Sequence, residues 1–301
     1  MDLSRFGSAP PWSLGVEEEL MLVDAEALEP ARDGFSRVFG EATERIKPEL
    51  FESFVEITTT VVETPEQVEE ELRELRHQVA ERAAEHGLAV LAAGSHPTAR
   101  GRVPIVPVKR YERLKAELGP QLYRQLVCGL HVHVSVPDPD TCLRAFEGVV
   151  PRLPELLAAS ANSPYWDGRD SGWRSIRSQI LLEMPTGGTP PVLRSWDDWR
   201  AASRDDSTRR HWDAWPRPEY GTLEVRVMDQ PTSLRRTAEF AADVQRLVRE
   251  AASSDGEPFD RREYEAARER AGREGGGPEA ERQLELGPEA AVREIALRTL
   301  G

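Results

Sequence analysis

The chain has 301 residues, 39% of them hydrophobic, and a protein of this length buries about three-quarters of its unfolded surface, in one large domain or two ordinary ones. Its formal net charge of −14 argues against a nucleic-acid partner, because nucleic-acid binding requires clustered positive charge. Two cysteines are too few for a disulfide framework, and no apolar run approaches the roughly 20 residues that cross a bilayer. We therefore expect a cytoplasmic protein that binds neither nucleic acid nor membrane.

Two strands are predicted near the start of the chain. Residues 13–24 alternate in the way that a strand requires, which places Glu17 and Glu19 together on one face. Residues 51–62 are rich in Val, Ile and Thr, which favour strands, and Glu56 lies on one face of this second strand. Both predicted strands therefore carry glutamates on a defined face.

Residues 64–86 predict an amphipathic helix. A capping hydroxyl, a first-turn proline and an amide at the third helical position begin it, and apolar residues then recur at helical spacing. Residues 88–93 predict a buried strand, and residues 94–109, with three prolines, predict a loop. Another helix is expected at residues 111–118.

The middle of the chain alternates strands, helices and long loops. Residues 127–136 predict a strand, and residues 141–160 predict a helix that two prolines interrupt. Residues 161–219 show no sustained period and predict long loops with short helices. A last strand at residues 220–229 and a long helix at residues 233–252 follow.

The composition changes after residue 252. Residues 253–288 are dense in Arg, Glu and Gly and carry little that a core could bury, which predicts helical pieces and a linker. A short terminal helix is expected after them. We therefore divide the chain into a main domain, residues 1–252, and a polar C-terminal extension, residues 253–301.

Acidic and imidazole side chains recur with the period of two on four of the predicted strands. They are Glu17 and Glu19, then Glu56, then His131 and His133, and finally Glu224 with Arg226 on the same face. Buried glutamates repel one another unless a cation compensates them. Because Mg²⁺ and Mn²⁺ prefer carboxylate oxygen and tolerate an imidazole, the pattern indicates a divalent-cation site.

Each feature also has an ordinary structural explanation. Three consecutive glutamates are typical of a solvated face, and two histidines in alternation can be one core residue and one surface residue. Glu224 and Arg226 can belong to cross-strand ion pairs. Their joint occurrence on several strands favours the cation site over these separate explanations.

The chain resembles the type 2 glutamate–cysteine ligase family, in its bacterial carboxylate-amine ligase branch, over about residues 12 to 252. Four segments carry most of the resemblance: LGVEEE at 14–19, FVEIT at 54–58, CGLHVHVS at 128–135 and TLEVRVMD at 222–229. The resemblance implies an α+β, glutamine synthetase-like fold, in which a curved antiparallel sheet forms a half-funnel with helices packed on its outer face. It also makes residues 1–252 the catalytic domain.

The resemblance further implies roles for individual residues, with ATP and Mg²⁺ or Mn²⁺ as cofactors. The implied metal ligands are Glu17, Glu19, Glu49, Glu56, His131 and Glu224. The implied catalytic residues are Arg226 and Glu56, and the implied nucleotide or substrate contacts are Arg169, Arg174, Arg177 and His133. Glu49 lies outside the strand pattern and rests on the resemblance alone.

The implied reaction joins a carboxylate to an amine through an acyl phosphate, with glutamate and cysteine as the leading substrate pair and a homodimer as the expected assembly. Two other functions remain open from the residues. One is a metal-dependent hydrolase in which His131 and His133 start a zinc site of a β/α barrel. The other is a family member without catalysis that binds a nucleotide or metabolite.

Overall fold

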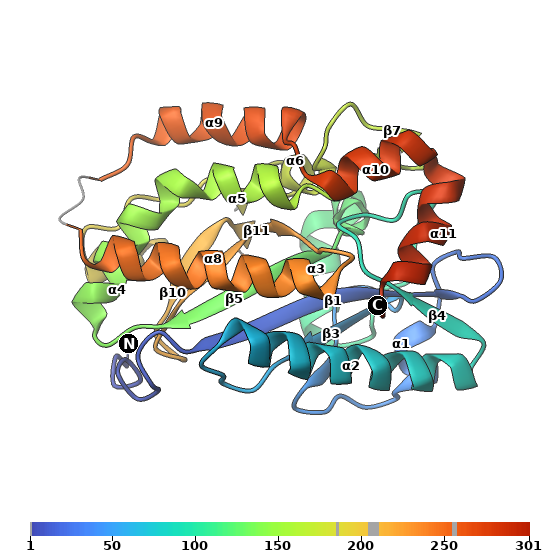
Figure 1. The fold of residues 1–301 in the computed structure, drawn as a ribbon, viewed down its shortest axis with the longest axis horizontal. Helices are drawn as coiled ribbons and strands as arrows, with labels where there is room; N and C mark the ends of the chain where they lie inside the picture. Colours follow the sequence, from blue (N-terminus) through green and yellow to red (C-terminus); the bar gives the residue numbers. More distant parts are fainter. Residues whose placement is uncertain (1, 185–186, 204–210, 255–257) are drawn as a thin grey trace.

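A computed structural model describes residues 2–184, 187–203, 211–254 and 258–301. Its centre is a seven-stranded sheet in the order β10-β11-β5-β1-β3-β2, with β4 paired to β1, and every pairing in it is antiparallel (Figure 1). The strands are β1 (Leu14–Asp24), β2 (Ile46–Pro48), β3 (Phe54–Thr58), β4 (Leu88–Leu91), β5 (Gly129–Ser135), β10 (Ala214–Arg217) and β11 (Thr222–Asp229). The sheet is open, because β10 and β2 end the order without pairing to each other.

A layer of helices covers one face of this sheet (Figure 1). It consists of α2 (Pro65–Glu85), α4 (Pro139–Val149), α5 (Leu153–Ser160) and α8 (Leu234–Ala252). Val16, Val132 and Val225 of the strands share one buried cluster with Leu72 of α2 and Val244 of α8. The hydrophobic effect thus fixes which face of each strand points to the helices, and the alternate residues must face the other way.

The remaining elements outside the C-terminal extension are short. They are α1 (Gly34–Val38), α3 (Lys109–Leu118), α6 (Ile176–Leu182), α7 (Trp196–Ala202), the 3₁₀ helices η1 (Gly119–Gln125) and η2 (Val150–Arg152), and the paired strands β6 (Tyr165–Trp166) with β7 (Arg169–Asp170) and β8 (Gly187–Gly188) with β9 (His211–Trp212). Among the described helices, none combines the length and apolar character that a membrane span needs.

The local signals of the sequence are confirmed where they are strong. At the start of α2 the Thr64 side chain accepts a hydrogen bond from the Gln67 backbone, while the Gln67 side chain accepts one from the Thr64 backbone, which completes a capping box. The helix expected at residues 141–160 is interrupted as predicted, since η2 separates α4 from α5. Proline explains the interruption, because it removes a backbone donor from the helix interior.

The sheet also contains two strands that the sequence did not predict. β2 has three residues and β10 has four, too few to show a clear alternation. Pro216 lies inside β10, where a proline is tolerated because this strand ends the sheet. These two strands are the edge strands of the sheet, β2 next to β3 and β10 next to β11.

The extension after residue 252 forms three helices, α9 (Arg261–Glu274), α10 (Pro278–Leu286) and α11 (Pro288–Arg298). α9 lies along α5, as Figure 1 shows above the helical layer. The expectation that residues 253–288 bury little is wrong, because Tyr264, Arg268, Ala280 and Gln283 are all buried. The polar composition hid this burial, since Tyr264, Arg268 and Gln283 carry polar groups that reach hydrogen-bond partners inside the fold.

Candidate functional site

The face of the sheet opposite the helical layer carries the polar residues predicted from the alternation. Glu17 is the cross-strand neighbour of His131, Glu19 is the neighbour of Glu56, and His133 is the neighbour of Glu224. Cross-strand neighbours project from the same side of a sheet, so three strand pairings bring these side chains together.

All of these side chains except His133 line a cavity of about 290 Å³. All the residues implied as metal ligands line it, namely Glu17, Glu19, Glu49, Glu56, His131 and Glu224. Glu49 directly follows β2, which is how a residue outside the predicted strands reaches the site. The cavity also has cationic and aromatic residues that the sequence did not single out, namely Lys47, Arg110, Tyr111, His211, Arg217 and Tyr220.

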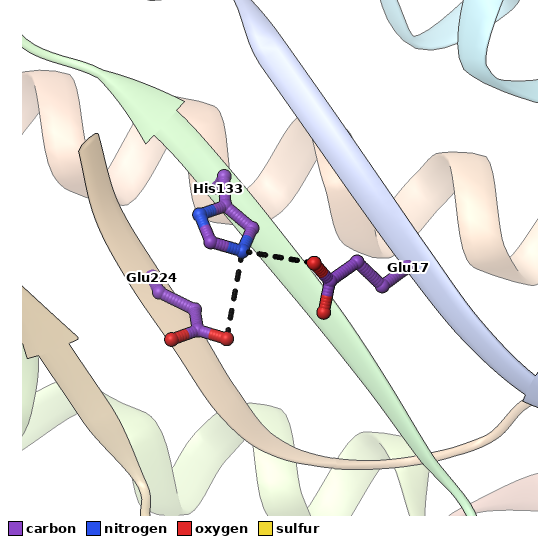
Figure 2. Close-up of side chains that lie close together, drawn as sticks. All are labelled: Glu17, His133 and Glu224. Atoms are coloured by element: carbon purple, nitrogen blue, oxygen red, sulfur yellow. Dashed lines mark ion pairs between the residues drawn. The ribbon is translucent and has the colours of Figure 1, made fainter. Parts of the chain in front are cut away.

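One end of this cluster holds a compact triad. Figure 2 shows the imidazole of His133 between the carboxylates of Glu17 and Glu224, with Nε2 3.6 Å from Glu17 Oε1 and 3.5 Å from Glu224 Oε1. The other ring nitrogen, Nδ1, lies 3.0 Å from the Thr222 hydroxyl, and this contact orients the ring. Nε2 is buried and forms ion pairs with both carboxylates, and it makes no hydrogen bond among the described residues. Burial opposes protonation of this ring, but the charges of Glu224 and Glu17 raise the pKa of His133 to about 9.

His131 occupies the middle of the cluster. Its Nδ1 lies 3.2 Å from Glu17 Oε2 and its Nε2 lies 3.9 Å from Glu19 Oε1, with the side chain only 3% exposed. Glu19 in turn accepts a hydrogen bond of 2.5 Å from the Gly129 backbone. The structure therefore places both histidines among the acids, His131 between Glu17 and Glu19, and His133 between Glu17 and Glu224.

The acids at the other end hold protons more tightly than ordinary glutamates do. Burial, reinforced by the charge of Glu19, raises the pKa of Glu49 to about 7. Burial and the charges of Glu17 and Glu49 raise the pKa of Glu56 to about 8, even though Lys47 Nζ lies 3.5 Å from Glu56 Oε1. The cations that the chain places here do not fully compensate these two carboxyl groups.

Glu17 and Glu224 behave in the opposite way. Burial works against ionisation of Glu17, but His131 and His133 outweigh it and hold the pKa well below the ordinary value. Burial also opposes ionisation of Glu224, but Arg226, His133 and Arg217 lower its pKa. The cluster thus has two parts. Nearby cations compensate the charges of Glu17 and Glu224, whereas those near Glu49 and Glu56 are not sufficient.

Arginines form the wall beside the acids. Arg226 forms an ion pair with Glu224, and Arg217 Nη1 lies 3.2 Å from the same carboxylate. Arg177 is buried, and its guanidinium donates to the backbone oxygens of Val227 at 3.3 Å and Arg226 at 3.1 Å. Gly129 makes room for it, because a side chain at that position would collide with the Arg177 guanidinium.

The other two arginines implied from the loop region lie elsewhere. Arg169 is an exposed residue of β7, and Arg174 is held through its backbone to Ser163 and Gly272; neither lines the cavity. In contrast His211, which sequence reasoning passed over, does line it. Burial and the charge of Arg226 lower the pKa of His211 to about 3, so this imidazole is neutral at physiological pH.

The donor set fits a hard divalent cation. Glu17, His133 and Glu224 each offer a ligand atom, and these atoms lie within 4.8 Å of one another. Carboxylate oxygens with one imidazole suit Mg²⁺ and Mn²⁺, and Nε2 of His133, which lies between the two carboxylates, would bind such an ion in place of its proton. The raised pKa values of Glu49 and Glu56 point the same way, because a cation placed among them would remove the repulsion.

Fold and site together define an α+β protein with a carboxylate-lined cavity on the uncovered face of an open antiparallel sheet. The sequence profile of the glutamate–cysteine ligase family 2 matches residues 13–294, which includes α9, α10 and most of α11. The chain belongs to this family, and the resemblance stated from the sequence is confirmed.

Curated relatives agree with this assignment. A candidate glutamate–cysteine ligase 2-1 from Rubrobacter xylanophilus is 38% identical over 249 residues, covering 79% of this chain and 66% of the relative. A second one from the same organism, 2-3, is 36% identical over 270 residues, covering 85% of this chain and 74% of the relative. A candidate glutamate–cysteine ligase 2 from Herpetosiphon aurantiacus is 34% identical and is covered over 65% of its length. The chain thus spans about two thirds to three quarters of the length of these relatives.

Solved structures show the same fold at low sequence identity. A bifunctional glutathione synthetase from Pasteurella multocida superposes with a TM-score of 0.64 at 17% identity, covering 96% of this chain and 49% of that one. A glutamate–cysteine ligase from Francisella tularensis, in complex with AMP, superposes with a TM-score of 0.60 at 13% identity, covering 99% and 80%. With the open antiparallel sheet, these likenesses confirm the predicted glutamine synthetase-like fold.

Proposed function

We propose that this protein is an ATP-dependent carboxylate–amine ligase that forms an amide through an acyl phosphate, with glutamate and cysteine giving γ-glutamylcysteine as the leading reaction. One observation carries the proposal: glutamates from several separate strands, two histidines and a wall of arginines converge on one cavity. Family membership and the names of the curated relatives support it.

Two groups of residues would hold divalent cations in this cavity or at its edge. One is the triad of Glu17, His133 and Glu224, and the other is formed by Glu19, Glu49, Glu56 and His131. When bound, Mg²⁺ or Mn²⁺ would offset the charge of the ATP phosphates and of the transferring phosphoryl group. The AMP in the Francisella tularensis enzyme supports an adenine nucleotide as substrate here.

The arginines would bind and orient the anionic partners. Glu224 beside it raises the pKa of Arg226, so this guanidinium stays charged although it is buried. Arg177 is held at the cavity wall by two backbone oxygens, and burial lowers its pKa from the ordinary value. Arginine suits carboxylates and phosphates because its planar donors match their oxygens. The sheet and the surrounding loops would limit water, which otherwise hydrolyses an acyl phosphate.

The two rival functions have less support. The hydrolase hypothesis needs a parallel β/α barrel, whereas β5, which carries His131 and His133, pairs antiparallel with both β1 and β11. The hypothesis of a binding module without catalysis predicts nothing about the acids, yet every implied metal ligand lines the cavity. We therefore favour the ligase.

Release of ADP by the full-length protein tests the proposal. We expect ADP release that depends on Mg²⁺ or Mn²⁺ and on both a carboxylate and an amine, measured across a panel that starts with glutamate and cysteine. Hydroxylamine in place of the amine should yield a hydroxamate, because it attacks an acyl phosphate and releases phosphate. Wild-type protein that consumes no ATP with any pair of the panel would leave the binding module as the better hypothesis.

Variants of the cavity acids connect this activity to the site. Glu17→Gln, Glu56→Gln and Glu224→Gln each remove one charged oxygen ligand and should reduce turnover by about a hundredfold or more, the scale seen when one electrostatic stabiliser is lost. Glu44→Gln is the matched control, because Glu44 is exposed and does not line the cavity. Retained turnover in all three cavity variants would contradict the assignment.

Assembly and location complete the proposal. The family resemblance favours a homodimer, and size-exclusion chromatography with light scattering measures the mass directly. Cys128 and Cys142 are both free and buried, which supports a reducing compartment such as the cytoplasm. Neither of these points affects the chemistry of the cavity.

A further inference from the structure

Helix α9 of the C-terminal extension places two polar side chains inside the protein. Arg268 is 3% exposed and Tyr264 is also 3% exposed, although α9 otherwise presents charged residues to solvent. A buried guanidinium is strongly unfavourable unless its charge and its donors are both satisfied. The hydrogen-bond partners of Arg268 therefore show which parts of the fold α9 stabilises.

The side chains of Arg268 and Tyr264 both donate hydrogen bonds to the carboxylate of Asp213. Arg268 Nε lies 2.6 Å from Asp213 Oδ2 and Nη2 lies 3.1 Å from Asp213 Oδ1, while the Tyr264 hydroxyl donates to Oδ2 at 2.7 Å. Asp213 is itself 3% exposed and lies between β9 and β10. A two-point arginine–carboxylate contact fixes direction as well as distance. α9 thus sets the position of the turn that contains Asp213.

This turn is part of the cavity wall. The backbone oxygen of Asp213 accepts a hydrogen bond of 2.8 Å from the backbone nitrogen of Arg226, whose side chain lines the cavity. The backbone nitrogen of Asp213 donates to Gly188 at 2.9 Å, and His211, another cavity residue, precedes it by two positions. Any displacement of Asp213 would therefore be passed to Arg226 and His211.

The same helix also holds α6, which carries Arg177, another of the arginines that line the cavity. Arg268 Nη2 donates to the backbone oxygen of Ser178 at 3.0 Å, next to Arg177. The backbone oxygen of Gly272 accepts hydrogen bonds from the nitrogens of Arg174 at 3.0 Å and Ser175 at 2.9 Å, at the start of α6. One guanidinium on α9 therefore bridges the segment that carries Arg177 and the segment that supports Arg226.

We infer that Arg177 and Arg226 together bind the carboxylate substrate, and that Arg268 is a positioning residue, which sets the spacing between these two side chains and so controls the affinity for that substrate. The inference rests on the proposed ligase function. It gives the C-terminal extension a role in substrate binding without contact with the substrate. The physical reason is that an anion held by two rigid donors loses binding energy steeply when their separation changes.

Arg268→Lys tests this inference with the full-length protein. Lysine keeps the positive charge next to Asp213 but cannot contact both carboxylate oxygens and Ser178 at once. We expect the KM for the carboxylate substrate to rise about tenfold or more, on the scale of a displacement of ~1 Å at a binding group, while the KM for ATP stays within about twofold. Arg270→Lys is the matched control, because Arg270 is an exposed residue on the same helix.

The outcomes separate the inference from the function on which it rests. A wild-type protein without turnover would overturn both. Wild-type turnover with an unchanged carboxylate KM in Arg268→Lys, or an equal rise in the KM values for carboxylate and ATP, would overturn the inference alone. If Arg268→Lys does not fold, Tyr264→Phe decides by the same criterion with a smaller rise, because it removes one hydrogen bond to Asp213 and leaves the ion pair in place.

Discussion

The two faces of β1 give neighbouring glutamates opposite electrostatic environments. Glu18 points to the helical layer and is completely buried, and Arg76 of α2 contacts both its oxygens at 2.7 Å. The Thr237 hydroxyl at 2.7 Å and the Gln230 amide at 2.9 Å complete its bonding. On this face the chain supplies the cation and the hydrogen bonds itself, and the carboxylate is structural.

The other face leaves part of its acidic charge without such partners. Glu17 and Glu19 contact imidazoles and a backbone nitrogen, and across the cavity burial and neighbouring acids raise the pKa values of Glu49 and Glu56. No arginine here contacts both oxygens of Glu56 in the way that Arg76 contacts those of Glu18 among the residues described. Glu18 therefore differs from Glu49 and Glu56, because the fold supplies a full cationic partner to Glu18 and leaves the other two carboxyl groups without one.

The largest effect is expected when the ion pair on the helix-covered face of β1 is removed. Arg76→Met leaves Glu18 buried without a cation, and the free energy of unfolding should fall by about 3–5 kcal/mol. Urea denaturation of variant and wild type measures the difference. Arg73→Met is the control on the same helix, since Arg73 pairs with Glu69 at the surface and its loss should cost less than about 1 kcal/mol. Equal losses of free energy of unfolding in the two variants would contradict a larger contribution from the buried ion pair between Arg76 and Glu18.

The next effect concerns divalent cations on the cavity face. Mg²⁺ or Mn²⁺ at about 100 times the dissociation constant should stabilise the wild type by about 2.7 kcal/mol, because the ion binds only the folded state. Glu56→Gln should lose most of this gain, while Glu44→Gln should keep it. Thermal unfolding with and without the ion measures the gain. A Glu56→Gln protein that is stabilised as strongly as the wild type would show that the ion binds elsewhere.

A third effect is the dependence of the free energy of unfolding on pH without divalent ions. The folded pKa values of Glu49 and Glu56, about 7 and about 8, lie above the ordinary value of 4.5. A raised pKa means that the folded state binds the proton more tightly, so the contribution of these groups is complete below pH 4.5 and is lost as the pH rises through 7 and 8. The Glu56→Gln variant should therefore lose less free energy of unfolding than the wild type between roughly pH 5.5 and pH 8.5, limits that follow from the two pKa values. Urea denaturation in the presence of a chelator measures both pH profiles. Parallel pH profiles would contradict the raised pKa of Glu56.

Much of the cavity was predictable because it rests on strands with a clear period. The alternation in residues 13–24, 51–62, 127–136 and 220–229 placed glutamates and histidines on one face, and the structure keeps them there. The family resemblance added Glu49, which follows a strand too short to show a pattern. These successes share a cause, since strand geometry converts local spacing directly into direction.

Residues in the loop region were not predictable in this way. Of three arginines considered there, Arg177 lines the cavity, whereas Arg169 and Arg174 do not. Arg177 reaches it because α6 is anchored by α9 and because Gly129 leaves space on β5. Neither cause lies near residue 177 in the sequence. His211 was missed for the same reason, as β9 has only two residues and pairs with β8.

The sequence by itself determined the strands β1, β3, β4, β5 and β11, the main helices, the family and the face on which Glu17, Glu19, Glu56 and Glu224 lie, because period and capping are local properties of the chain. Only the tertiary structure decided which buried acid received an arginine and which did not. It also decided that Arg268 is an interior residue. The physical reason is that charge compensation and burial depend on partners far apart in sequence, as Glu18 with Arg76 and Asp213 with Arg268 show.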